Sequence, residues 1–366
     1  MAFSRAIVVL AAVVHVAVVH VAVVHVAVAQ AVDTRGRALG QFVLARAVWR
    51  PPAKSVPSTF PVLDSARLIA NISALAADSM EGRRLGTAGG ARARAFLIRE
   101  LARSGIAPAR DSFPVSFSVR SRTGPAITGV NLIGTIRGTK HADRCIVVSA
   151  HYDHLGVRNG VIYAGADDNA SGTAAVLAIA QWFARHPPEN TMIFALFDGE
   201  EEGLLGSKAF VGSPPVPLAR IVANVNLDMV SRNVNGEIYA SGAAPYPVMK
   251  PLLDSIARAA PVTLLLGHDT GLGESNWIEQ SDQGAFASRK IPFVYFGVED
   301  HPDYHKPGDR VEHIQPGFYY RCVRTIAEFV RRLDVSLDRI AAVRRAVPAR
   351  APIASDQPPS GYQASA

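Results

Sequence analysis

The chain has 366 residues, of which 49% are hydrophobic and 19% charged, and its formal net charge is +7. This composition is typical of a folded globular protein and excludes a largely disordered chain. A cluster of arginines lies at residues 321–345, without an RNP, helix-turn-helix or zinc-finger pattern. It therefore indicates a solvated basic face and no nucleic-acid partner.

Close to the first residue of the sequence, Arg5 is followed by an apolar run from Ala6 to Ala29 that repeats the five residues VVHVA. A basic start, an apolar middle and a small-residue cleavage site typify secretory signals, and "AVAQA" offers cleavage after Ala29 or Ala31. A run of this length could also span a bilayer. We therefore predict a secreted or periplasmic protein, with residues 1–31 as a cleaved signal peptide or an N-terminal anchor.

Three further segments follow from composition. Residues 32–60 are predicted to be a proline-containing linker, and residues 347–366, rich in Ala, Pro and Ser, a disordered tail. Residues 61–343 have the size of a single α/β domain. Its two cysteines, Cys145 and Cys322, form no CxxC pair, so we expect buried thiols, with a disulfide as the alternative in an oxidising compartment.

Helices and strands alternate through this domain. Helical periodicity runs through residues 65–78 and through residues 89–105, where Gly105 ends the pattern as a C-cap glycine would. Apolar strands are predicted at residues 129–138, 145–151, 191–197, 221–229 and 292–297, and helices at 171–186, 248–260 and 319–342. Continuously apolar strands separated by helices predict an α/β fold with a mostly parallel central sheet and helices on both faces. Ligands of such sheets bind beyond the carboxyl ends of the strands.

Acidic residues and histidines follow these strands where each one ends. They are His151, Asp153, Asp167, Asp168, Asp198, Glu200, Glu201, Glu202, Asp228 and His305. Buried carboxylates must be paired or bind a cation, and ligation by His and carboxylate without thiolates favours zinc, with cobalt or manganese as substitutes. The carboxylates exceed the needs of one tetrahedral ion, so we expect two metals about 3.5–4 Å apart.

These residues stand in the motifs "SAHYDHLG", "GADDNASGTAAVL", "DGEEEGLLGS", "VNLDM", "SDQGAF" and "DYHKPGD", preceded by "DSMEGRRLGTAGGARARAFLIREL". In order and spacing, these motifs resemble those of the M28 metallopeptidases, a family of zinc aminopeptidases. The resemblance covers residues 63–335 and implies a single catalytic domain of zinc-exopeptidase, phosphorylase/hydrolase-like architecture. No room is left for the protease-associated domain that some relatives carry.

The resemblance also implies the metal ligands. By position, His151 and Asp228 would hold one zinc ion, and Glu201 and His305 the other. Asp167 would bridge both ions. His154 matches no ligand position and is expected not to bind metal.

Three further features of the site follow. In this family the bridging aspartate precedes a non-proline cis peptide bond, which implies a cis bond between Asp167 and Asp168. Glu200 would be the general base that activates a metal-bridging water. Asp153 lies two residues after His151 on the same face of the strand end, so we expect its carboxylate to accept the imidazole N–H and orient the ring, with a turn role as the alternative.

The other acidic residues of the cluster are not expected to bind metal or to take part in catalysis. Glu202 is expected at a solvated helix start and Asp198 beside the ligands or at a cap. Two positions depart from the family pattern. The chain reads SDQ at residues 281–283 where the family often has SDH, and no tyrosine stands near Trp277 to steady the tetrahedral intermediate, which leaves Tyr304 and Tyr246 as candidates.

The function implied by the resemblance is that of an exported dizinc aminopeptidase acting on peptides with a free N-terminus. The alternatives are a related zinc amide hydrolase or dipeptidase, a glutaminyl cyclase with a single zinc, and a metal-free binding homologue. Loops around Phe286, Phe296 and Trp277 are expected to line the specificity pocket.

Overall fold

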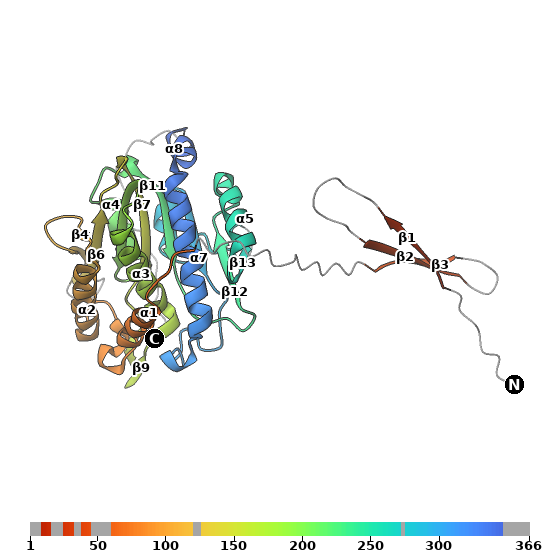
Figure 1. Cartoon of the computed structure of the whole chain (residues 1–366). Helices are drawn as coiled ribbons and strands as arrows, with labels where there is room; N and C mark the ends of the chain where they lie inside the picture. Colours follow the sequence, from red (N-terminus) through yellow and green to blue (C-terminus); the bar gives the residue numbers. More distant parts are fainter. Residues whose placement is uncertain are drawn as a thin grey trace. The chain divides into compact units, whose positions relative to one another are not determined.

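The chain is described here by a computed structural model that covers residues 9–15, 25–32, 38–44, 60–119, 126–271 and 275–346. It divides into two units, residues 1–58 and residues 59–366. The first unit contains an antiparallel sheet of three strands in the order β1 (Val9–His15), β2 (His25–Val32) and β3 (Ala38–Leu44) (Figure 1).

Strand β3 falls within residues 32–60, so the predicted linker contains regular structure that the sequence analysis did not predict. Within the part of the chain that the structure describes, no helix is both long and apolar enough to cross a membrane. The predicted disordered tail, residues 347–366, lies outside the described residues. Export and cleavage near residue 31 remain predictions.

The second unit is built on a nine-stranded sheet in the order β13-β12-β14-β11-β7-β10-β6-β4, with β5 paired to β6. The strands are β4 (Ala107–Pro108), β5 (Pro114–Val119), β6 (Ile127–Ile136), β7 (His141–His151), β10 (Asn190–Phe197), β11 (Ile221–Leu227), β12 (Glu237–Ser241), β13 (Thr263–Leu266) and β14 (Phe293–Gly297). The four central strands, β14, β11, β7 and β10, are mutually parallel, whereas β6 and β12 run antiparallel to their central neighbours. The predicted parallel sheet is confirmed at its centre, within a sheet that is mixed overall.

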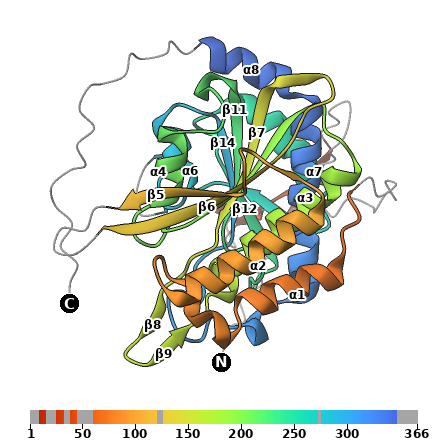
Figure 2. The ribbon, with the colours of Figure 1, turned by 90° about the vertical axis from the view of Figure 1, so that its left-hand side faces the viewer.

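Helices cover both faces of this sheet, as predicted. They are α1 (Ser65–Leu75), α2 (Ala88–Ser104), α3 (Gly172–Arg185), α4 (Leu205–Gly212), α5 (Lys250–Ala259), α6 (Gln283–Ser288), α7 (Pro316–Val335) and α8 (Leu337–Ala346). Figure 2 shows α4 and α6 on one side of the sheet, opposite α3 and α7. A hydrophobic core lies on each face of the sheet, and successive residues of β7 point into the two cores alternately. Ile146 and Val148 pack in the core on the α3 side, and Val147 packs in the core on the α4 side.

The helix ends show which local signals were informative. Thr87 caps α2 by accepting the Gly90 N–H, and Gly105 ends it with a left-handed φ of 82°, as predicted. The helix predicted at residues 319–342 is two helices, α7 and α8. They separate at Ser336, whose hydroxyl donates to the carbonyl of Arg332 at 2.7 Å.

Both cysteines are free and buried, which confirms the expectation of buried thiols. Cys145 belongs to the core on the α4 side of the sheet, and Cys322 to the core on the α3 side. The two thiols are therefore separated by the sheet.

Candidate metal centre

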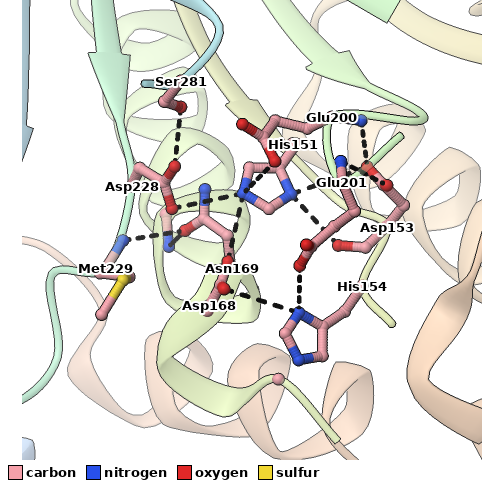
Figure 3. Close-up of polar contacts among 12 residues, drawn as sticks. His151, Asp153, His154, Asp168, Asn169, Glu200, Glu201, Asp228, Met229 and Ser281 are labelled. Carbon is pink, nitrogen blue, oxygen red and sulfur yellow. Dashed lines mark hydrogen bonds and ion pairs between the residues drawn. The ribbon is translucent and has the colours of Figure 1, made fainter. Parts of the chain in front are cut away.

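Six of the polar residues predicted at the strand ends lie close together in Figure 3, namely His151, Asp153, Asp168, Glu200, Glu201 and Asp228. His151 is the last residue of β7, and Asp228 follows the last residue of β11. Glu200 and Glu201 come three and four residues after β10 ends at Phe197. Parallel strands end together, so three segments distant in sequence deliver side chains to one place.

The first group of side chains surrounds His151, which is almost completely buried. Its Nε2 atom lies 3.3 Å from Asp228 Oδ1 and 3.3 Å from Asp168 Oδ1. Glu200 Oε2 is farther away, at 4.0 Å. The Nδ1 atom of His151 faces the Asp153 carbonyl at 3.2 Å, so Nε2 is the ring nitrogen directed at the carboxylates.

The second group surrounds His305, in the loop that follows β14. Its Nε2 atom lies 3.2 Å from Asp168 Oδ2 and 3.2 Å from Glu201 Oε2. The two oxygens of Asp168 are thus divided between the two groups. One faces His151 and the other His305.

The expectation that Asp167 bridges the two groups is therefore wrong by one residue. Asp167 Oδ1 instead accepts hydrogen bonds from the backbone N–H and hydroxyl of Ser231, both at 2.7 Å, and its Oδ2 lies 3.3 Å from His301 Nε2. The non-proline cis peptide bond is shifted in the same way and joins Asp168 to Asn169. Adjacent residues point their side chains in different directions, so only one of two neighbouring aspartates can face the histidines.

The four contacts to His151 and His305 fit metal ligation. Two ligand atoms of a tetrahedral zinc ion, each about 2.0–2.2 Å from the metal, lie about 3.3 Å or slightly more from each other. Charge-assisted hydrogen bonds of the same groups are shorter, at about 2.7–2.9 Å. The measured separations of 3.2–3.3 Å match the first arrangement. Imidazole and carboxylate donors without thiolate suit zinc.

The electrostatics of the site also favour cations. Burial lowers the pKa of His151, but the carboxylates of Asp228 and Glu200 outweigh burial and raise it well above its usual range. Burial lowers the pKa of His305 as well, and Asp168 and Glu201 nevertheless raise it to about 10. Both imidazoles thus lie where buried negative charge attracts positive charge.

Contrary to the prediction, Asp153 does not accept the imidazole N–H of His151 through its carboxylate. Its carboxylate Oδ1 lies 3.6 Å from His151 Nδ1, beyond hydrogen-bond distance, and its backbone carbonyl is the closer partner of the ring. The carboxylate instead accepts the backbone N–H of Glu200 at 3.1 Å and of Glu201 at 3.4 Å. Asp153 therefore fixes the turn that carries both glutamates.

The remaining acids of the cluster lie away from the two groups. Glu202 precedes α4 but is half-buried and forms a salt bridge with Arg84 at 2.9 Å, so the expected solvated carboxylate is wrong. Asp198 Oδ2 accepts the backbone N–H of Val130 at 2.9 Å. Burial raises the pKa of Asp198 to about 7.

Two residues that the sequence analysis did not single out hold the backbone beneath the site. Asp309 accepts the N–H of Asp167 at 2.9 Å and that of Asp168 at 3.0 Å. Arg83, fully buried, donates to four carbonyls, namely Leu75, Tyr152, Ala164 and Gly165, at 2.6–2.8 Å. Only their motifs, "KPGD" and "MEGRR", signalled them, because their partners are backbone atoms.

The departure from SDH is accommodated by an uncharged network. Gln283 Oε1 accepts from Asn226 Nδ2 at 3.0 Å, and its Nε2 donates to the Trp277 carbonyl at 2.6 Å. Ser281, two residues earlier, donates its hydroxyl to Asp228 Oδ2 at 2.7 Å. The SDQ segment therefore contacts a candidate ligand residue, Asp228, directly.

The expected lining of a specificity pocket is partly wrong. Phe286 and Phe296 are completely buried. The first packs in the core on the α4 side and the second in the core on the α3 side. Trp277 is half-buried and stacks on His268 with ring centroids 3.7 Å apart. Of the tyrosine candidates, Tyr304 stacks on His305 at 4.0 Å, whereas Tyr246 packs against Phe293.

Comparison with known proteins places this centre in a family. The model of peptidase family M28 matches residues 131–330, more than half of the 366-residue chain. The chain belongs to peptidase family M28. The matched range contains every residue of the two groups, since it includes the segments that follow β7, β10, β11 and β14.

Named relatives of this M28 chain match parts of it. A probable zinc metalloprotease of Pyrenophora tritici-repentis is 35% identical over 106 residues, which are 28% of this chain and 24% of the relative. Aminopeptidase YwaD of Bacillus subtilis is 32% identical over 199 residues, 51% of this chain and 41% of the relative. The M28 chain thus spans less than half the length of these relatives.

A solved structure supports the same fold. Glutaminyl cyclase of Porphyromonas gingivalis superposes with a TM-score of 0.62 at 17% identity, over 73% of this chain and 98% of that one. At this identity the likeness concerns the fold of the M28 chain alone.

Proposed function

We propose that this M28 chain is an aminopeptidase that binds two zinc ions and releases the N-terminal residue of peptides. The observation that carries the proposal is the position of Asp168, with one carboxylate oxygen 3.3 Å from His151 and the other 3.2 Å from His305. Asp228 would complete the ligands of one ion and Glu201 those of the other. Cobalt or manganese could substitute for zinc.

When bound, the two zinc ions would polarise the peptide carbonyl and lower the pKa of the attacking water. Glu200 is the acid–base residue of the proposal: it accepts a proton from the water as the oxygen attacks the carbonyl carbon, and it returns that proton to the leaving nitrogen as the C–N bond breaks. Burial raises the pKa of Glu200 well above its usual range, and His151 opposes this shift. The Asp153 carboxylate holds the Glu200 backbone in place for both transfers.

A second candidate is suggested by the fold shared with glutaminyl cyclases, which implies cyclisation of N-terminal glutamine. The presence of two groups of ligand residues favours the dizinc peptidase over a cyclase with a single zinc. A zinc dipeptidase, a broader amidase and a metal-free binding protein are the remaining possibilities, and zinc content and substrate choice distinguish them.

The experiment compares leucyl anilide, N-acetyl-leucyl anilide and a glutaminyl peptide as substrates of the zinc-loaded chain. An aminopeptidase cleaves the first and not the second, because acetylation removes the free amine. Equal rates on both anilides would establish a broader amidase, and loss of ammonia from the glutaminyl peptide without hydrolysis would establish a cyclase. The Glu200→Gln variant controls for contaminating peptidases.

We further propose that the chain is exported, either cleaved near Ala29 or Ala31 or held by its N-terminal segment. The support is the apolar run that follows Arg5 and ends in "AVAQA". Intact-mass analysis of protein expressed with its full N-terminus tests this. A mature chain that starts near Gln30 or Val32 indicates cleavage, and Met1 retained in a membrane fraction indicates an anchor.

A further inference from the structure

Asp228 in the first group and Glu201 in the second have similar surroundings, because each turns one carboxylate oxygen toward a histidine and the other toward a second side chain. Asp228 turns Oδ1 toward His151, and its Oδ2 accepts the hydroxyl of Ser281 at 2.7 Å. Each oxygen of this carboxylate thus has one task. One is available to an ion and the other is held by a buried donor, since Ser281 is 2% exposed.

Glu201 repeats this arrangement with a histidine in place of the serine. Its Oε2 faces His305 at 3.2 Å. Its Oε1 lies 2.6 Å from Nδ1 of His154 (Figure 3). Neither of these two buried atoms has another hydrogen-bond partner among the described residues. Buried polar atoms without a partner are costly, which favours pairing of these two atoms.

The ring of His154 is closely packed. The side chain is completely buried. Its ring lies against the backbone of Gly165, where an added Cβ would come within 2.5 Å of the imidazole carbons. Gly165 is held in turn by Arg83, which donates to its carbonyl at 2.8 Å. Packing therefore restricts the movement of the ring, whose Nδ1 faces Glu201.

The distances around His154 indicate whether it binds a zinc ion or supports Glu201. Ligand atoms of one tetrahedral zinc ion lie about 3.3 Å or more apart, so a contact of 2.6 Å is too short for His154 and Glu201 to share the ion through these two atoms. Nδ1 is also 3.7 Å from Asp168 Oδ2, farther than either His151 or His305 from the same carboxylate. The separation of 2.6 Å fits a direct contact between the imidazole and one carboxylate oxygen.

We propose that His154 is the positioning residue of Glu201: it binds Oε1 through Nδ1–H and so fixes Oε2 for the zinc ion beside His305. Ser281 has the corresponding role at Asp228. The inference rests on the proposed dizinc site and adds that each ion has its own supporting donor. Affinities of the two ions can therefore be changed independently.

The test measures the affinity of each zinc ion by chelator competition, and the absorption spectrum of the cobalt-substituted protein, in three variants. Removing an outer hydrogen-bond partner of a ligand typically costs 10–100-fold in metal affinity. His154→Leu should weaken only the ion beside His305 by about 10–100-fold. His154→Asn, whose amide nitrogen can replace Nδ1, should restore most of that loss. Ser281→Ala should weaken only the ion beside His151.

The outcomes are distinguishable from failure of the proposed function, which would appear as fewer than two ions bound by the unaltered chain. If the unaltered chain binds two ions, equal weakening of both in His154→Leu would overturn the inference, and so would affinities unchanged by that substitution. A shift of the cobalt absorption bands in fully loaded His154→Asn would identify His154 as a ligand and also overturn it. Unaltered bands with the expected affinities would support it.

Discussion

Asp167 and Asp168 are neighbours in the chain, yet their carboxylates face opposite surroundings. Asp168 lies between the imidazoles of His151 and His305. Asp167 accepts two hydrogen bonds from Ser231. The pair therefore offers two substitutions of identical chemistry, one in the proposed metal centre and one beside it.

Asp168→Asn is expected to reduce the zinc content from two ions per chain to one or none, because an amide is a poor bridging ligand. Asp167→Asn should retain both ions, since its amide oxygen can still accept from Ser231. Atomic emission on the two purified proteins measures the difference. The reverse pattern, with zinc lost from Asp167→Asn alone, would restore Asp167 as the bridge.

Glu200→Gln should retain both zinc ions and lose about 10²–10⁴-fold in kcat, the usual contribution of a general base. Glu202→Gln is the matched control, because its carboxylate pairs with Arg84 and not with the histidines. Steady-state rates on leucyl anilide test the assignment. An active Glu200→Gln enzyme, or an inactive Glu202→Gln enzyme, would contradict it.

Arg83→Met is expected to lower the free energy of unfolding by about 3 kcal/mol or more, since buried carbonyls lose their donor at about 1–3 kcal/mol for each unsatisfied group. Arg84→Met, the next residue, should cost less than about 1 kcal/mol because it breaks only a half-exposed salt bridge. Urea denaturation of both variants provides the comparison. Similar midpoints would argue against Arg83 as an anchor.

Native protein should be inert to a thiol reagent at pH 8, and the unfolded chain should present two thiols. Both cysteines are buried, and burial raises the pKa of Cys145 to about 11, so the reactive thiolate is absent at this pH. Titration with a chromogenic disulfide, with and without denaturant, measures both states. An unfolded, unreduced chain without reactive thiols would indicate a disulfide.

Sequence patterns predicted the central strands and the side chains at their ends, because apolar runs and strand-end polar residues are local signals. They did not distinguish Asp167 from Asp168, since the direction of each side chain depends on the loop held by Asp309. His154 was expected not to bind metal, and its contact with Glu201 joins two segments that only the folded sheet brings together.

The same limit explains the other differences. Phe286 and Phe296 are apolar residues near the site, but whether they line a pocket or fill a core depends on packing against α4 and α7. The break at Ser336 carries no proline or glycine, and a local hydrogen bond to Arg332 accompanies it. Composition alone also gave no sign of β3 within the predicted linker.

Anomalous scattering at the zinc edge from crystals of the zinc-loaded protein tests the central claim most directly. We expect two peaks about 3.5–4 Å apart, one on each side of the Asp168 carboxylate, with the first also bound by His151 and Asp228 and the second by Glu201 and His305. A single peak, or a pair of peaks centred on Asp167, would contradict the account.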